Sequence, residues 1–355
     1  MFEPFPKGAG SKLLLSVSNT RVVGIDLDMS IVAELRRLSG RLDAWQQRHR
    51  ATAFPCAVIR KFGDDGGSSL AALLAYYAFF SVFPLLMALD SITASVLHQN
   101  EQLRSRLLQS ALSEFPLIGE QLRSNVGTIR GSVPVVAFGI GAAIWAGLAV
   151  LTSLQRAMDT VWDVPRRARA ASLERLLRGA IALGALGLLV LAATATAGVA
   201  TGLAPAAGLV LSAALNVATM AVIFRASTTA RISWADVLPG ALVAGLGWTV
   251  LQGSGAYVVD RYVRGASETY GTFAVVVGLL SWLYVGAQLS VLAAEVNVVR
   301  CRRLWPRSLL PPPTRPEDER ALALQVRREE VLPSERISVT SGRDTPSDHP
   351  ETNDS

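Results

Sequence analysis

The sequence predicts an all-α integral membrane protein, a six-transmembrane-helix bundle with flanking amphipathic helices. Half of the 355 residues are hydrophobic and 17% are charged, and the charges are dense before residue 66 and after residue 299. A helix of about 20 apolar residues crosses the hydrocarbon core of a bilayer, because each residue advances the helix by about 1.5 Å. The middle of the chain supplies enough apolar stretches for six crossings.

Each predicted crossing is a long stretch with few or no charged residues. Residues 179–224 are uncharged over about twice the length of one crossing, so we expect a helical hairpin that turns near residues 202–205. A soluble helical protein is the alternative, but its core helices normally carry a polar face, which residues 177–200 lack. The predicted spans lie near residues 69–96, 132–156, 178–202, 205–225, 237–259 and 271–298.

The distribution of Lys and Arg predicts the orientation of these spans, because basic residues near the ends of spans favour the cytoplasmic side. With six spans, most basic residues near the membrane fall on one side. The connection after the first span departs from this rule, since it carries Arg104, Arg106, Arg123 and Arg130 on the predicted outer side. We expect both termini in the cytoplasm.

Three regions follow along the chain. Residues 1–54 form a cytoplasmic segment with an amphipathic helix, which either lies on the membrane surface or packs on the rest of the protein. Residues 55–305 form the membrane domain, and residues 306–355 form a tail that is predicted to be disordered because it has few apolar residues. The apolar face of the amphipathic helix consists of Ile31, Leu35, Leu38, Leu42 and Trp45.

The basic charge belongs to the membrane part. From Pro311 onward the tail has six Arg against ten Asp or Glu, although the whole chain carries a net charge of +6. The pI near 9.7 therefore indicates membrane topology and attraction to lipids. It does not indicate a nucleic-acid partner.

Four segments in this order resemble the YihY/BrkB family of bacterial inner-membrane proteins. They are SLAALLAYYAFFSVFPLLMAL, SLQRAMDTVWDVPRR, ISWADVLPGALVAGLGW and YGTFAVVVGLLSWLYVGAQLSVLAAEVN. The resemblance covers about residues 55–300 and implies a six-helix bundle in the bacterial cytoplasmic (inner) membrane with both ends inside. Members of the family have been called ribonuclease BN, linked to serum resistance as virulence factors, and discussed as lipid or solute exporters.

The positions of the histidines do not favour a nuclease. A metal-dependent nuclease needs clustered His, Asp or Glu ligands that hold and activate a water molecule. The three histidines, His49, His98 and His349, fall in an amphipathic segment, a connection and the tail. We expect no enzymatic activity, no cofactor, no metal site and no nucleic-acid partner.

Polar residues within the spans are the candidates for function, because lipid cannot solvate them. In the last span they recur at spacings of three, four and seven residues and share one helix face, where Glu295 could bind a cation or a proton. The alternative is that Glu295 reaches the membrane border and pairs with an arginine such as Arg178 or Arg225. Gln252 and Asn216 lie in other spans, and we expect each of them to contact a neighbouring helix or a substrate. The candidate polar path comprises Ser281, Tyr284, Gln288, Glu295, Gln252 and Asn216.

Two further features come from the first span and from the connection after the second span. Pro84 is predicted to kink the first span, since it removes a backbone donor. The second feature matches a motif of the family. It is either a cytoplasmic gate or docking site, or a helix end fixed by an Asp to Arg pair. This cytoplasmic motif consists of Arg156, Asp159, Trp162, Asp163 and Pro165.

The sequence leads to two hypotheses for the function. The first is a transporter or exporter of lipids or solutes of the cell envelope, suggested by six spans, a kinked first helix and a polar stripe in the last one. The second is a non-transporting membrane scaffold or envelope-assembly partner. The expected partners are membrane lipids, further copies of the chain in a homo-oligomer, and a small-molecule or lipid substrate whose identity the sequence leaves open.

Overall fold

The computed structural model describes residues 40–96, 133–169, 177–179, 205–258, 272–308 and 315–337, apart from positions 42 and 333, together with Glu174. All regular elements in these ranges are helices, so the all-α class is confirmed for this part of the chain. Most of the predicted N-terminal amphipathic helix, the connection at 98–130 and the turn near 202–205 lie outside the described residues.

The labelled elements are seven α-helices and one short 3₁₀ helix within the described ranges. In chain order they are α2 (Arg50–Asp64), α3 (Gly67–Val96), α6 (Val133–Val161), η1 (Arg166–Ala168), α8 (Pro205–Ala226), α9 (Trp234–Val258), α11 (Thr272–Arg302) and α12 (Pro316–Arg328).

Three of the described helices are long and apolar enough to cross a bilayer. They are Ala206–Ala226 in α8, Trp234–Ser254 in α9 and Val276–Arg302 in α11, and Gly67–Val82 in α3 is a shorter apolar segment. The span predicted near 178–202 lies almost entirely outside the described residues. The chain thus has several candidate spans, and the count of six stays a prediction.

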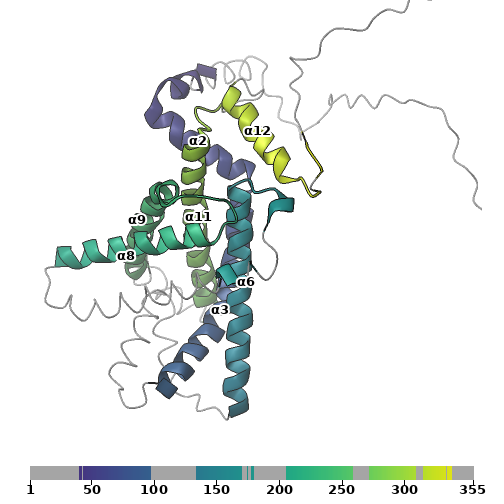
Figure 1. Cartoon of the computed structure of the whole chain (residues 1–355). Helices are drawn as coiled ribbons and strands as arrows, with labels where there is room; N and C mark the ends of the chain where they lie inside the picture. Colours follow the sequence, from purple (N-terminus) through teal and green to yellow (C-terminus); the bar gives the residue numbers. More distant parts are fainter. Residues whose placement is uncertain are drawn as a thin grey trace, which may run out of the picture.

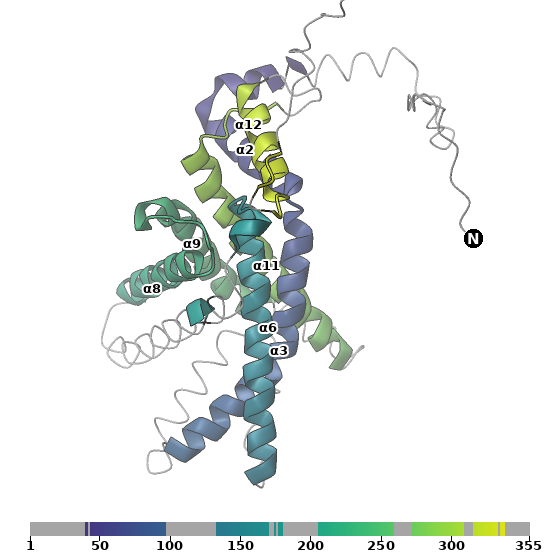
Figure 2. The ribbon, with the colours of Figure 1, turned by 45° about the vertical axis from the view of Figure 1, so that its right-hand side comes forward.

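The helices pack in a row in which each contacts the next. α6 packs on α3, α3 on α11, α11 on α9, and α9 on α8, while α2 contacts both α11 and α3. α3, α6 and α11 run alongside one another, whereas α8 projects sideways across the direction of α6 (Figure 1). Figure 2 shows the same arrangement turned by 45°. α11 is thus the central helix, and it meets α2, α3, α6 and α9.

Pro84 lies inside α3. The ribbon of α3 changes direction along its length (Figure 2). A proline within a helix removes one backbone hydrogen bond and clashes with the preceding turn, which gives a physical reason for such a bend.

A glycine sets the close approach of α9 to α11. The Gly240 N–H donates to Asn297 Oδ1 at 2.6 Å, and both residues are buried. A Cβ at position 240 would lie 2.2 Å from the Ala293 carbonyl oxygen. Only a residue without a side chain fits here, and small residues permit this kind of close contact between membrane helices.

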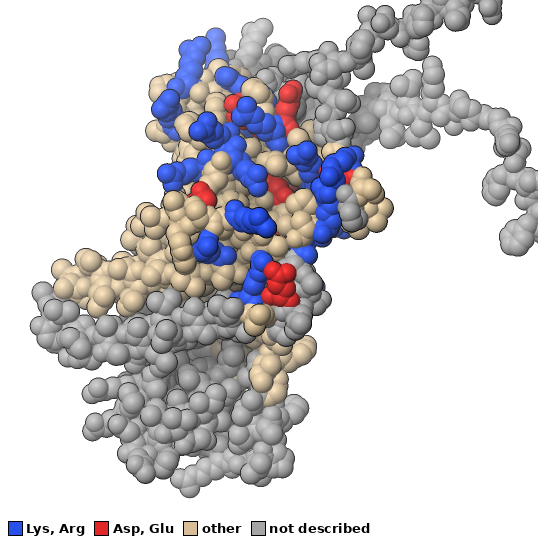
Figure 3. All heavy atoms as spheres, viewed as in Figure 1, with Lys and Arg blue, Asp and Glu red and all other residues tan. Residues whose placement is uncertain are grey.

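Basic side chains gather at one end of the molecule. The visible face of α2, α12 and the adjoining loops carries many Lys and Arg residues, whereas the projecting α8 does not (Figure 3). We call this the basic end; it comprises α2, α12, the last turns of α6, α8 and α11, and the first turn of α9. The most deeply buried apolar side chains of this end include Met158, Val161, Phe224, Val237 and Val298.

The interpretation of residues 306–355 as a disordered tail is wrong for residues 315–337, which include α12. α12 has Pro316 at its start, three acids in its first turn and two arginines in its last turn. These charges complement the helix dipole, and Asp318 and Ala321 are buried against the rest of the protein. Ion pairs hold this segment in place, so it does not need a large apolar core. Residues 338–355 lie outside the described part.

The described part of the N-terminal segment packs on this end. Residues 40–48, apart from 42, are helical, and the buried Gln46 donates to the Arg307 carbonyl at 2.9 Å. Trp45 of the predicted apolar face is exposed, and its ring lies 4.8 Å from the His49 ring. The remaining residues of that face lie outside the described residues.

Candidate functional site

Lys61, in the last turn of α2, lies among three acidic side chains, one of them four residues away and two from distant parts of the chain. Its Nζ is 2.5 Å from Asp65 Oδ2, 3.2 Å from Asp163 Oδ2 and 3.6 Å from Glu295 Oε2. The ammonium also donates to the Val161 carbonyl at 3.1 Å. None of the four side chains is more than 3% exposed. These groups bring together α2, the end of α6 and α11.

Arg328 of α12 adds a second cation to this group. Its Nη1 is 2.9 Å from Asp65 Oδ1 and donates to the Thr160 carbonyl at 3.3 Å. Gln325, one turn earlier, donates to the same Asp65 oxygen at 3.5 Å. We call Lys61, Asp65, Asp163, Glu295 and Arg328 the ion cluster.

The ion cluster contains three carboxyl groups and two cations. Burial alone would lower the pKa of Lys61, but attraction by Glu295, Asp163 and Asp65 outweighs burial and leaves that pKa above its ordinary value. Burial raises the pKa of Asp163, against the opposing attraction of Lys61. With every group ionised the cluster would hold one uncompensated negative charge away from water, and burying such a charge is costly.

The backbone after α6 places Asp163. Asp163 has a φ of 52°, in the left-handed region that Asp tolerates better than most residues. The turn is closed by the Asp163 N–H to the Thr160 carbonyl at 3.1 Å and the Val164 N–H to the Asp159 carbonyl at 2.9 Å. The carboxylate oxygens of Asp163 make no other hydrogen bond within the described residues, so their orientation depends on the ion pair with Lys61.

Asp159 holds the loop between α8 and α9. Its Oδ1 accepts the Thr229 backbone N–H at 2.7 Å and the Thr228 hydroxyl at 3.3 Å, and its Oδ2 accepts the Thr229 hydroxyl at 3.2 Å. Asp159 is 3% exposed. One interpretation of the sequence was that an Asp to Arg pair fixes this helix end. Asp159 instead accepts hydrogen bonds from two threonines.

A second ionic group joins α12 to α2. Arg307 lies 2.7 Å from Asp64 Oδ2 through Nη1 and 3.0 Å from Asp318 Oδ1 through Nε. Asp318 Oδ2 also accepts the Ser308 backbone N–H at 3.1 Å. At the other end of α12, Glu330 pairs with Arg167 at 2.6 Å. α12 is thus attached by charge at both of its ends.

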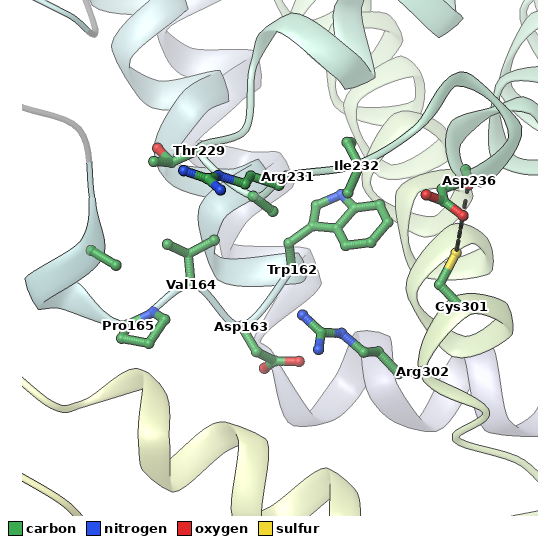
Figure 4. A pocket seen from close by; sticks show the side chains of 12 residues that line it. Trp162, Asp163, Val164, Pro165, Thr229, Arg231, Ile232, Asp236, Cys301 and Arg302 are labelled. Atoms are coloured by element: carbon green, nitrogen blue, oxygen red, sulfur yellow. Dashed lines mark hydrogen bonds between the residues drawn. The ribbon is translucent and has the colours of Figure 1, made fainter.

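A cavity of about 490 Å³ opens beside the ion cluster (Figure 4). Asp163 belongs to its wall as well as to the ion cluster. Trp162 also lines it; this indole is 2% exposed, and its N–H has no hydrogen-bond partner within the described residues. Figure 4 shows the Arg302 side chain extending toward Asp163, and Arg231 lies on the opposite wall. We call this space the Trp162 cavity, and its size is typical of ligand sites.

A second cavity, of about 700 Å³, shares residues 229–232 of the loop between α8 and α9 with the Trp162 cavity. It is lined by Arg178, Arg225 and Arg231, by loop residues, and by Trp234 at the start of α9. Arg231 is common to both cavities. We call this space the arginine cavity.

The predicted polar stripe of α11 does not have one uniform environment. Ser281 is exposed, and its hydroxyl donates to the Val277 carbonyl of its own helix at 2.8 Å. Tyr284 and Gln288 are half-buried, and Glu295 is fully buried. Glu295 pairs with Lys61, while Arg178 pairs with Glu174 and Arg225 donates to the Ile232 carbonyl. The suggestion that Glu295 pairs with Arg178 or Arg225 is therefore wrong.

Asn216 and Gln252 contact each other across α8 and α9. Asn216 Nδ2 donates to Gln252 Oε1 at 3.1 Å and to Thr249 Oγ1 at 2.9 Å. These bonds explain both residues as contacts between neighbouring helices. A role of either residue in a substrate path stays a prediction.

The residues of the cytoplasmic motif have different surroundings. Arg156 is exposed, whereas Asp159, Trp162 and Asp163 are buried and Pro165 precedes η1. The motif thus supplies both a brace for the 227–233 loop and one carboxylate of the ion cluster. Whether it gates or docks anything stays a prediction.

Sequence reasoning missed Lys61, Asp65 and Arg328 as members of the site. Lys61 and Asp65 are spaced i, i+4 at the end of α2, a pattern that indicates a local ion pair. Nothing in the sequence indicates that both pack against Glu295, which is 230 residues or more further along the chain.

The described residues contain no group of three or more His, Cys, Asp or Glu arranged to hold a metal ion, and the expectation of no metal site stays a prediction. The position that a cation could occupy among Asp65, Asp163 and Glu295 is filled by Lys61 Nζ.

Comparison with known proteins places this architecture in a family. The chain is 23% identical to the ribonuclease-like protein YfkH of Bacillus subtilis over 262 residues, which cover 67% of this chain and 91% of YfkH. It is 24% identical to a UPF0761 membrane protein of Chromohalobacter salexigens and 26% identical to one of Azotobacter vinelandii. These matches cover 67% and 72% of this chain but 61% and 65% of the two relatives, so it spans about two thirds of their length. No solved structure matches.

The match to the family extends over most of the residues discussed above. Residues 58–317 match the family described as virulence factor BrkB, a range that includes the cytoplasmic motif, both cavities and four of the five residues of the ion cluster. The likeness to the YihY/BrkB family is thereby confirmed, and the chain belongs to the virulence factor BrkB family of membrane proteins.

Proposed function

We propose that this membrane protein is a transporter of a lipid or solute and that the ion cluster couples transport to a proton or cation. The observation that carries the proposal is that Asp163 belongs both to the ion cluster and to the wall of the Trp162 cavity. A ligand in this cavity would therefore lie next to buried groups whose charge can change. Ionisable groups buried in membrane proteins commonly mark ion or substrate pathways.

The coupling follows from competition for the carboxylates. A proton on Asp163 or Glu295, or a cation among the three acids, would weaken the hold on Lys61 Nζ. Lys61 joins α2 to α6 and α11, so its release would loosen the contact among these helices. Ligand and ion would then influence each other through the shared Asp163, as coupled transport requires.

The test is translocation of a fluorescent phosphatidylglycerol in vesicles that contain the purified full chain. We expect the wild-type protein to move the labelled lipid between leaflets. Glu295→Gln should lose most of that activity, because the substitution removes one of the three negative charges around Lys61. Glu319→Gln is the matched control, since Glu319 lies on the exposed surface of the first turn of α12 and is not part of the ion cluster. Equal activity of Glu295→Gln and wild type in folded protein would remove the ion cluster from the mechanism.

The second candidate function is a non-transporting scaffold for envelope assembly. The observation that favours it is that the polar residues of α11 do not share one environment. Ser281 is exposed and donates to its own helix, whereas Glu295 is fully buried in the ion cluster. On this reading the ion cluster only fixes α2 and α12 to the bundle. A stable envelope protein that co-purifies with the chain, together with no translocation of any lipid, would support the scaffold.

We also infer that the chain is not a ribonuclease. This inference rests on the scattered histidines and on the absence of a metal-binding group among the described residues. Purified protein incubated with transfer RNA and Mg²⁺ or Mn²⁺ should leave the RNA intact.

A further inference from the structure

The arginine cavity lies where the last turn of α8 meets the first turn of α9. Three arginines line it, and none of the described residues in its wall is acidic. Both helices contain candidate membrane spans, Ala206–Ala226 and Trp234–Ser254. The cavity is thus located at the end of two apolar helices, at the level where the headgroups of a bilayer would lie.

The three guanidinium groups keep donors available. Arg225 donates to the Ile232 carbonyl and stacks over the Trp234 ring at 4.9 Å, which orients its plane. Arg178 donates to the Thr228 carbonyl at 3.4 Å and pairs with Glu174. Arg231 is exposed and has no hydrogen bond or ion pair with any described residue. Since each guanidinium has five N–H donors, all three can reach a further acceptor.

An apolar ridge leads away from the cavity along α9. Five large apolar side chains recur every fourth residue and are between 44% and 71% exposed. A spacing of four residues places them in one row inclined to the helix axis, and 16 residues of helix extend over about 24 Å. This length exceeds the roughly 15 Å of hydrocarbon in one leaflet of a bilayer, so the ridge is long enough for a whole acyl chain. The ridge consists of Trp234, Leu238, Leu242, Leu246 and Val250.

We propose that the arginine cavity binds the phosphate headgroup of an anionic phospholipid, whose acyl chain lies along the Trp234 to Val250 ridge. Arginine is well matched to phosphate because its planar N–H groups donate to two oxygens at once. The ridge favours a lipid over a soluble phosphate, since it offers an apolar surface directly beside the cavity. The site does not require transport, because a lipid can be retained by a protein that moves nothing.

The test is native mass spectrometry of the detergent-purified full chain titrated with dioleoyl phosphatidylglycerol or with phosphatidylcholine of the same acyl chains. We expect phosphatidylglycerol to bind at least tenfold more tightly, because the positive choline group of the other lipid would face three arginines. Arg231→Ala should weaken phosphatidylglycerol binding about tenfold, the effect of losing one charge-assisted hydrogen bond. Arg225→Ala should do the same, so the result does not depend on a single variant.

Arg320→Ala is the matched control, since Arg320 is an exposed arginine on α12 and does not line the cavity; its binding should equal that of wild type. Glycerol 3-phosphate, tested as a competitor, should displace the lipid only at far higher concentration. Equal binding of the two lipids, or unchanged binding in both Arg231→Ala and Arg225→Ala, would overturn the site. Displacement by glycerol 3-phosphate at the concentration of the lipid would show a soluble phosphate site and overturn the lipid assignment.

Discussion

Lys61 faces all three carboxylates of the ion cluster, and the sequence does not single it out. Glu295 could be chosen from the sequence because an acid in an otherwise apolar helix must be solvated by protein. Its partner could not, since Lys61 stands at the end of an amphipathic helix where a basic residue is ordinary. The pairing depends on how α2 packs on α11, which no local pattern encodes.

Removing the cation should cost more stability than removing one acid. Lys61→Met leaves three buried carboxylates with Arg328 alone, and breaking a buried ion pair in this way costs about 3–5 kcal/mol. Glu295→Gln leaves two acids with two cations, so we expect a smaller loss of stability. The double variant Lys61→Met/Glu295→Gln should recover part of the stability that Lys61→Met loses. The measurement is the free energy of unfolding in mixed detergent micelles.

The control for these variants is Arg156→Met, which removes an exposed charge from α6. It should change stability by no more than about 0.5 kcal/mol. If Lys61→Met were as stable as the wild type, the ion cluster would not hold α2 in place.

At the scale of the element, the sequence predicts helices α9 and α11 but does not predict α12. The long apolar stretches predict helices because the bilayer leaves the backbone no other way to satisfy its hydrogen bonds. α12 has few apolar residues, and the composition of its segment suggests disorder. Its capping pattern, with Pro316 at the start, acids in the first turn and arginines in the last, was the signal that could have identified it.

The contact between α9 and α11 gives a sharp prediction from two glycines of the same helix. Gly240→Ala should destabilise the protein by about 1–3 kcal/mol, because the new Cβ would lie 2.2 Å from the Ala293 carbonyl oxygen and would force the helices apart. Gly253→Ala should stay within about 1 kcal/mol of wild type, since nothing lies within 4 Å of a Cβ there. Thermal unfolding in detergent compares the two, and an equal effect of both substitutions would contradict the close approach of α9 and α11.

At the scale of the whole molecule, composition was enough to predict a helical membrane protein, and the arrangement of its helices was not. Arg231 lines one cavity together with Arg302 and a second cavity together with Arg225, so these three basic residues lie at the same end of the described structure. The side of the membrane that this end faces, and the number of crossings, stay predictions. Both depend on residues outside the described ranges.

The proposed coupling belongs to the same scale, because it would involve α2, α6, α11 and α12 together. The ion cluster holds these four elements with buried charges, and the Trp162 cavity shares Asp163 with it. A molecule built in this way should respond to a proton gradient as one unit.

The most direct measurement is the rate of labelled phosphatidylglycerol translocation in vesicles with an imposed pH gradient and after an ionophore has collapsed that gradient. The account predicts that the wild-type rate falls to the background rate when the gradient collapses, and that Glu295→Gln shows the background rate in both conditions. A wild-type rate that is the same with and without the gradient would contradict coupling through the ion cluster.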